Sequence, residues 1–159
     1  MAALRVLAIA VAYRRVGYVY LIGEKLMDWS ISSKAARSTV DAAETTQQWI
    51  NTLAPEVLVT EKTEAATRKG ERTKAIIAAI VGTAAHNYLL DVAVARRQRF
   101  RNKYEEAAAL AEWYPEVAAL VPTRKFQDDE PRVTVLFEAL ALAETITGGS
   151  PLGIAAAMG

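Results

Sequence analysis

The sequence of 159 residues contains no cysteine, one histidine and a net charge of only +1. Without cysteine the chain has neither disulfides nor thiolate metal sites, as expected of a protein in the reducing cytoplasm. Because neither sign of charge dominates, any attraction to nucleic acid must come from basic residues that cluster locally. The longest apolar run, from Ala75 to Ala85, is well below the roughly 20 residues that a membrane-spanning helix needs. These absences predict a soluble, cytoplasmic protein with no membrane partner.

The first apolar run allows a competing interpretation as a secretory signal. The residues VLAIAVA, which start at Val6, contain the small-residue pattern Ala10-Val11-Ala12, which mimics a cleavage site. This run is at the short limit for a signal peptide, however, and cleavage there would remove a strand that the following RRVGYVYLI needs as a partner. We therefore interpret the run as a strand, so apolar that both of its faces must be covered.

The spacing of apolar residues predicts a mixed α/β fold. With 52% hydrophobic and 23% charged residues, the chain is typical of one globular domain, expected over residues 1–146, with a flexible tail at 147–159. A period of two from Leu4 to about Ile31, broken at 13–15 and 23–25, predicts a three-stranded antiparallel meander whose third strand is an edge. Further strands are expected at 57–60 and 91–95, the second of a buried type, and helices at about 33–54, 71–90, 115–120 and 132–146. Another helix is expected to follow the basic stretch RRQRFRNK and to run through about Trp113.

This order of elements gives a five-stranded mixed sheet with helices on both faces. The antiparallel meander supplies three strands and a parallel pair supplies the other two, with the first strand naturally in the centre. Periodicity alone does not fix the order of the strands.

Two acidic residues are candidates for a functional site. Glu61 follows a four-residue apolar strand, at the end where open α/β sheets usually place ligands, although a solvated acid that opens a loop is the alternative. Glu138 lies in VTVLFEALALA, a helix that is apolar nearly all round. Burial of an unpaired carboxylate is costly, so Glu138 needs a divalent cation, a proton or a position at the rim. His86, the single histidine, is expected to be structural.

Three segments, VLAIAVAYRRVGYVYLI, VLVTEKTE and DDEPRVTVLFEALALAE, resemble the RuvC family of Holliday-junction resolvases and its bacterial relatives, within the RNase H-like superfamily. The resemblance spans Val6 to about Ile146. It implies that Glu61 and Glu138 are catalytic metal ligands. It also places Ala10 at the position of the family's first catalytic aspartate, and Val135 where the family's last helix carries a further acid one turn earlier.

The resemblance implies a metal-dependent, structure-selective endonuclease that hydrolyses phosphodiesters in branched DNA with Mg²⁺ or Mn²⁺. In two-metal hydrolysis one ion activates water and the other stabilises the leaving oxygen. Ala10 offers no lone pair, so we expect this form to cut poorly or not at all. An engineered aspartate-to-alanine change, natural decay into a binding protein and a likeness of fold alone all remain open. The alternative function is a non-catalytic nucleic-acid-binding or scaffold protein.

Basic residues cluster where a DNA backbone could run, and phosphate contacts of this kind give affinity without sequence choice. The alternative is a set of solvated charges paired with neighbouring glutamates. The small residues of 75–85 would let a second helix approach, in a possible homodimer as in RuvC-like proteins, or would simply meet the sheet. The predicted phosphate contacts are Arg14, Arg15, Arg68, Lys69, Arg72, Lys74, Arg96, Arg97, Arg99 and Arg101.

Overall fold

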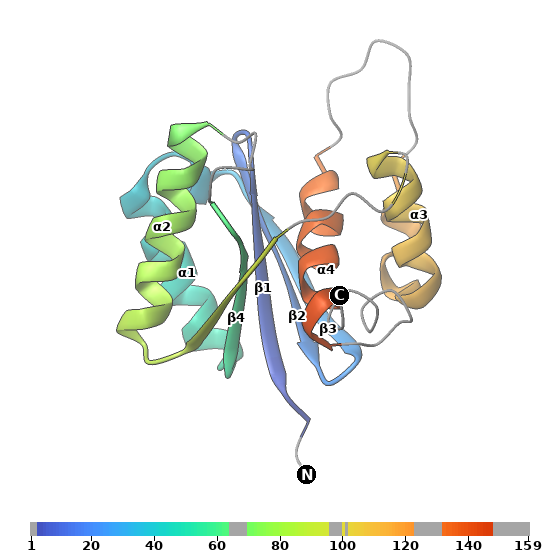
Figure 1. Ribbon diagram of the computed structural model, residues 1–159, viewed down its shortest axis with the longest axis horizontal. Coiled ribbons are helices and arrows are strands. Elements are labelled where there is room, and N and C mark those ends of the chain that lie inside the picture. Colours follow the sequence, from blue (N-terminus) through green and yellow to red (C-terminus); the bar gives the residue numbers. More distant parts are fainter. Residues whose placement is uncertain (1–2, 64–69, 96–99, 101, 123–131, 148–159) are drawn as a thin grey trace.

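A five-stranded mixed sheet forms the centre of the protein in a computed structural model that describes residues 3–63, 70–95, 100, 102–122 and 132–147 (Figure 1). The strands lie in the order β3-β2-β1-β4-β5, in which the first three are antiparallel and β4 and β5 run parallel to β1. Their bounds are β1 Arg5–Ala12, β2 Arg15–Ile22, β3 Lys25–Ser32, β4 Val57–Glu61 and β5 Leu90–Val94. The predicted fold class and the central place of the first strand are confirmed.

Strand β1 is buried on both faces because its alternate side chains enter two different apolar clusters. Val6, Ala8 and Ala10 belong to one cluster. Leu7, Ile9 and Val11 belong to the other. Since successive side chains of a strand point to opposite faces, the uninterrupted apolar run is what a strand covered on both sides requires.

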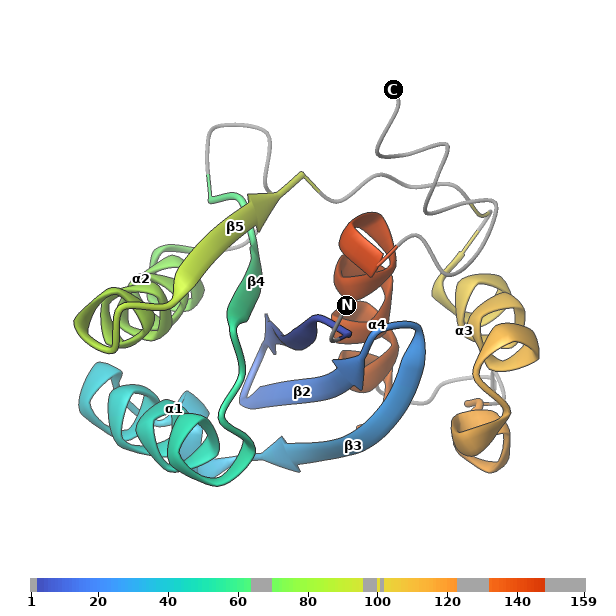
Figure 2. The same ribbon diagram turned by 90° about the horizontal axis from the view of Figure 1, so that it is seen from below.

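The helices form layers on the two faces of the sheet (Figures 1 and 2). One face is covered by α1 (Thr39–Leu53) and α2 (Glu71–His86), and the other by α4 (Thr134–Thr147), with α3 (Lys103–Trp113) on the outer side of α4. Two 3₁₀ helices, η1 (Lys34–Ala36) and η2 (Pro115–Leu120), precede α1 and follow α3. Because α4 has protein on both sides, nine of its 14 residues are buried and none is exposed, as its apolar sequence predicts.

Two element boundaries and the burial of one strand differ from those expected. The helix expected from residue 33 begins at Thr39, because Ser38 is its N-cap and accepts a hydrogen bond from the Asp41 N–H at 3.0 Å. Helix α2 ends at His86 rather than at residue 90, since Tyr88 adopts a left-handed conformation. The prediction of a buried-type last strand is wrong: β5 is an edge strand, and Leu90 is 63% exposed.

Two further expectations concern the C-terminal tail and membrane-spanning helices. Of the tail expected at 147–159, Thr147 is the last residue of α4, and residues 148–159 lie outside the described part of the chain. Among the described helices, none combines the length and hydrophobicity that crossing a bilayer would take.

A close approach between helix α4 and the sheet is made possible by Gly17. This residue pairs with Ala10 across β1 and β2. A Cβ atom added to Gly17 would lie 2.9 Å from Cγ1 of Val135. Helix α4 therefore rests directly on the sheet at this point, in a contact that has no room for a methyl group.

We predict that Gly17→Ala lowers the free energy of unfolding by about 1–3 kcal/mol, the usual cost of overpacking. Gly82→Ala is the matched control, because nothing lies within 4 Å of its added Cβ and alanine favours a helix. This control should raise stability by about 0.5–1 kcal/mol. Urea unfolding measures both changes.

The double variant Gly17→Ala/Val135→Ala tests the contact itself, since removal of the valine methyl groups relieves the clash. Its stability loss should be smaller than the sum of the two single losses. Additive losses would contradict the packing of α4 at Gly17.

Candidate functional site

The first predicted site residue, Ala10, lies in a buried apolar contact between helix α4 and the sheet. Ala10 and Val135 are each 2% exposed and belong to the same apolar cluster. Gly17 lies beside Ala10 on β2 and directly beneath Val135. The methyl groups of two residues therefore occupy the positions at which the resemblance to RuvC implies carboxylates.

Glu61 lies on the same face of the sheet, at the carboxyl end of β4. Strands β1 and β4 pair in parallel with Ala8 opposite Val59, and both of these side chains enter the α4-side cluster. Ala10 and Glu61 each follow two residues later, so the alternation of side chains directs both toward that same face. The carboxyl ends of parallel strands are where α/β sheets place their ligands.

Glu138 follows Val135 by one turn of α4, so both are on the sheet-facing half of the helix. One side-chain oxygen, Oε2, is buried in each of Glu138 and Glu61. Each of the two residues also has an interaction within the chain, so neither carboxylate is without a partner. The structure thus brings Ala10, Glu61 and Glu138 to one face and one end of the sheet, while their roles in catalysis stay a prediction.

The residues present do not fit a two-ion metal centre. A hard divalent cation takes oxygen ligands, and in the two positions filled by Ala10 and Val135 the chain offers only hydrocarbon. Within the described ranges, no group of three or more histidine, cysteine, aspartate or glutamate side chains is placed to hold a metal ion. Glu61 and Glu138 are what remains of the donor set implied by the resemblance.

Asp91 is a further carboxylate near these strands, but it points to the opposite face. In β5 it pairs with Leu58, whose side chain enters the cluster beneath α1 and α2. The Thr60 hydroxyl donates a hydrogen bond to Asp91 at 3.4 Å, and burial raises the pKa of the Asp91 carboxyl. Asp91 therefore does not complete the site, and sequence alone gives no sign of its environment.

Two of the predicted phosphate contacts have partners inside the protein. The Arg72 guanidinium donates to the backbone oxygen of Arg37 at 2.8 Å and so holds the end of η1. Lys74 forms an ion pair with Glu71 at 3.6 Å. The alternative of charges paired with neighbouring glutamates therefore describes Lys74, whereas Arg72 is held by backbone oxygens.

The other basic residues divide into those that the structure describes and those that it does not. Arg14 is exposed in the turn between β1 and β2, and Arg15, partly exposed, has an interaction within the chain. Arg37, which sequence reasoning did not select, is exposed after η1. The predicted contacts Arg68, Lys69, Arg96, Arg97, Arg99 and Arg101 lie outside the described residues.

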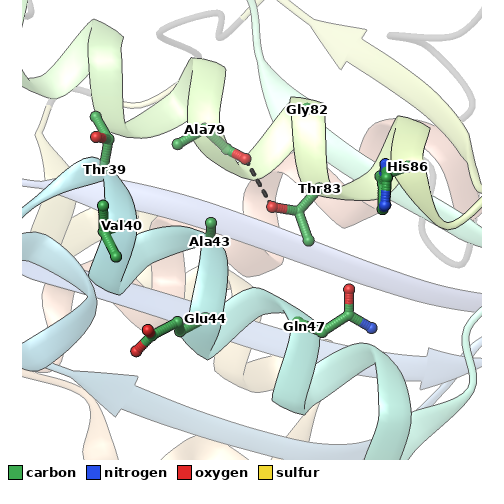
Figure 3. Close-up of a pocket in the computed structure, with 9 residues that line it drawn as sticks. All are labelled: Thr39, Val40, Ala43, Glu44, Gln47, Ala79, Gly82, Thr83 and His86. Carbon is green, nitrogen blue, oxygen red and sulfur yellow. Dashed lines mark hydrogen bonds between the residues drawn. The ribbon is translucent and has the colours of Figure 1, made fainter.

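A groove of about 600 Å³ runs between α1 and α2, on the face of the sheet opposite to α4 (Figure 3). Its floor includes the small residues Ala43, Ala79 and Gly82. His86 lies at one end of the groove, on the other side of the sheet from Ala10, as expected for a residue outside the predicted site. The small-residue face of α2 thus turns partly toward α1.

Comparison with known proteins finds similarity in structure but not in sequence. No protein-family model and no curated protein matches the sequence. RuvC from Thermus thermophilus aligns with a TM-score of 0.58 at 13% identity, over 88% of this chain and 91% of RuvC. The fowlpox virus Holliday junction resolvase aligns with a TM-score of 0.63 at 12% identity, over 92% of this chain and 100% of that one. The yeast mitochondrial resolvase Ydc2 aligns with a TM-score of 0.56 at 10% identity, over 92% and 80%.

Both T. thermophilus RuvC and the fowlpox resolvase also match as complexes with Holliday junction DNA. At identities this low, the likeness establishes the fold and leaves the activity open. The chain has the RNase H-like fold of RuvC and other Holliday junction resolvases.

Proposed function

We propose that this protein binds branched DNA through a RuvC-like nuclease scaffold and that, with alanine at position 10, it does not cut the DNA. The observation that carries the proposal is the apolar contact of Ala10 and Val135 above Gly17. It lies at the carboxyl end of the parallel strands, where this fold would need carboxylates for phosphodiester hydrolysis. The complexes of two structural neighbours with Holliday junctions support branched DNA as the partner.

Loss of cleavage follows from the chemistry of the missing oxygens. Hydrolysis with two Mg²⁺ or Mn²⁺ ions needs ligands that hold both ions on one phosphate. Hydrocarbon at positions 10 and 135 supplies none, and the two remaining carboxylates, Glu61 and Glu138, are too few for that arrangement. We propose that an aspartate at position 10 would restore the metal-dependent endonuclease activity implied by the resemblance to RuvC.

Binding does not depend on those oxygens, because phosphate contacts from arginine and lysine supply most of the affinity for DNA. Arg14 and Arg37 are exposed at the end of the sheet that carries Ala10. We further propose a homodimer. A four-way junction presents two equivalent pairs of arms that are related by a two-fold axis, and a dimer, the commonest protein oligomer, has the same symmetry.

We predict that the protein binds a four-way junction more tightly than a linear duplex of the same sequence and length. Because binding releases counterions from the DNA, the affinity should fall by more than about 10-fold between 50 and 200 mM salt. Fluorescence anisotropy with labelled junction and duplex measures both effects. Equal affinity for junction and duplex, or no binding to either, would contradict the proposed function.

The variant Ala10→Asp tests the nuclease scaffold, and Ala8→Asp is its matched control. Both residues are buried on the same face of β1, but Ala8 lies two residues further from the strand's carboxyl end. In EDTA both variants should lose several kcal/mol of stability, because each buries a carboxylate. Millimolar Mn²⁺ should restore stability to Ala10→Asp alone, by about 2.7 kcal/mol at 100 times its Kd.

Ala10→Asp should also nick branched DNA with Mn²⁺ present, and Ala10→Asp/Val135→Asp should do so faster, since it supplies both absent carboxylates. Ala10→Asn, which is equal in size but uncharged, should not cut. If Mn²⁺ stabilises Ala10→Asp and Ala8→Asp equally, the metal-centre assignment is wrong.

The alternative is a binding or scaffold protein on the same fold with no latent catalytic centre. It predicts that Ala10→Asp still binds the junction but neither takes up Mn²⁺ nor nicks any branched substrate. The burial of Ala10 and Val135 in the apolar core agrees with both functions, so the response of Ala10→Asp to Mn²⁺ decides between them.

A further inference from the structure

The turn between β1 and β2 presents an aromatic ring to solvent next to the candidate site. Tyr13 is 75% exposed, although a large ring is ordinarily covered. The guanidinium of Arg14 lies 4.9 Å from the centre of that ring, in a cation–π contact. One face of the ring is thus held by a cation, and most of its surface is open.

The backbone conformation of this turn is unfavourable for the residue that occupies it. Arg14 has a φ of 62°, in the left-handed region that favours glycine. The other hairpin of the same meander, between β2 and β3, places Gly23 at the same φ of 62°. A bulky residue kept in such a conformation points to a role for its side chain beyond folding.

The turn also lies at the same end of the sheet as the candidate site. Tyr13 follows Ala10 by three residues along β1, a rise of about 10 Å. Figure 1 shows this turn at the end of the molecule where α2 and α4 begin, which is the end that holds Gly17 and Val135. A DNA strand that reached Ala10 and Glu61 would pass close to the exposed ring.

We propose that Tyr13 is a stacking platform for a base whose face is left uncovered at the branch point of DNA, with Arg14 on the ring's other side. This inference rests on the proposed function and adds a specificity determinant to it. Aromatic side chains stack on uncovered base faces without regard to sequence, because every base has a π-face. Bases inside a linear duplex are already stacked on their neighbours, so the ring gains a partner only where a junction leaves a base open.

The stacking role predicts a loss of affinity that is confined to branched DNA. Tyr13→Ala should weaken binding to a four-way junction about 10-fold, the usual effect of removing one base–aromatic stack, and leave duplex binding unchanged. Tyr13→Phe keeps the ring and should retain junction affinity. Fluorescence anisotropy with junction and duplex measures these effects, and thermal unfolding confirms that the variants are folded.

Tyr88→Ala is the matched control, because Tyr88 is 96% exposed and also has a positive φ, of 60°. It lies just before β5, at the end of the sheet away from Tyr13, since Leu90 and Val6 both pair with Val57 at the start of β4. This variant should bind the junction as the unchanged protein does. A loss equal to that of Tyr13→Ala would overturn the proposal.

A photochemical cross-link provides the second readout. A junction that carries 5-iodouracil at the branch point should cross-link to Tyr13, as identified by mass spectrometry, and the same base in mid-arm should not. If the unchanged protein binds no branched DNA, the proposed function fails. If it binds the junction but Tyr13→Ala binds equally well, or weakens junction and duplex alike, the stacking role alone fails.

Discussion

The structure depends on the burial of strand β1 on both of its faces. Six consecutive apolar residues from Val6 to Val11 exclude water from both sides of the sheet, so each side must carry a helical layer. On one side α1 and α2 share this task, and on the other α4 does it alone. Because a single helix covers that face, it must lie very close to the strands, and Gly17 makes the approach possible.

The same contact decides the chemistry that this sequence supports. The resemblance to RuvC implies oxygen ligands where the last helix meets the first strand, and such buried carboxylates would cost stability that a bound cation offsets. Ala10 and Val135 turn that place into ordinary core packing. Under the proposed function, apolar packing and metal ligation would compete for these two positions, and this sequence has apolar residues at both.

The residues of the proposed DNA contact lie at the carboxyl end of the parallel strands. Glu61 ends β4 there, and the tip of the first hairpin extends beyond it with Tyr13 and Arg14. These residues are not needed to cover β1, so core packing does not constrain them. The proposed binding surface and the proposed metal centre therefore depend on different residues, so a change in one need not alter the other.

The sequence by itself determined the elements, because helix and strand periodicity, the cap at Ser38 and the break at Pro55 depend on neighbours a few residues apart. It also determined that β1 is central, since its residues are apolar on both faces. Only the tertiary structure decided that β5 is an exposed edge, that Arg72 holds η1, and that Val135 rests on Gly17 beside Ala10. Those contacts join residues far apart in the chain, and local pattern does not specify which distant surfaces meet.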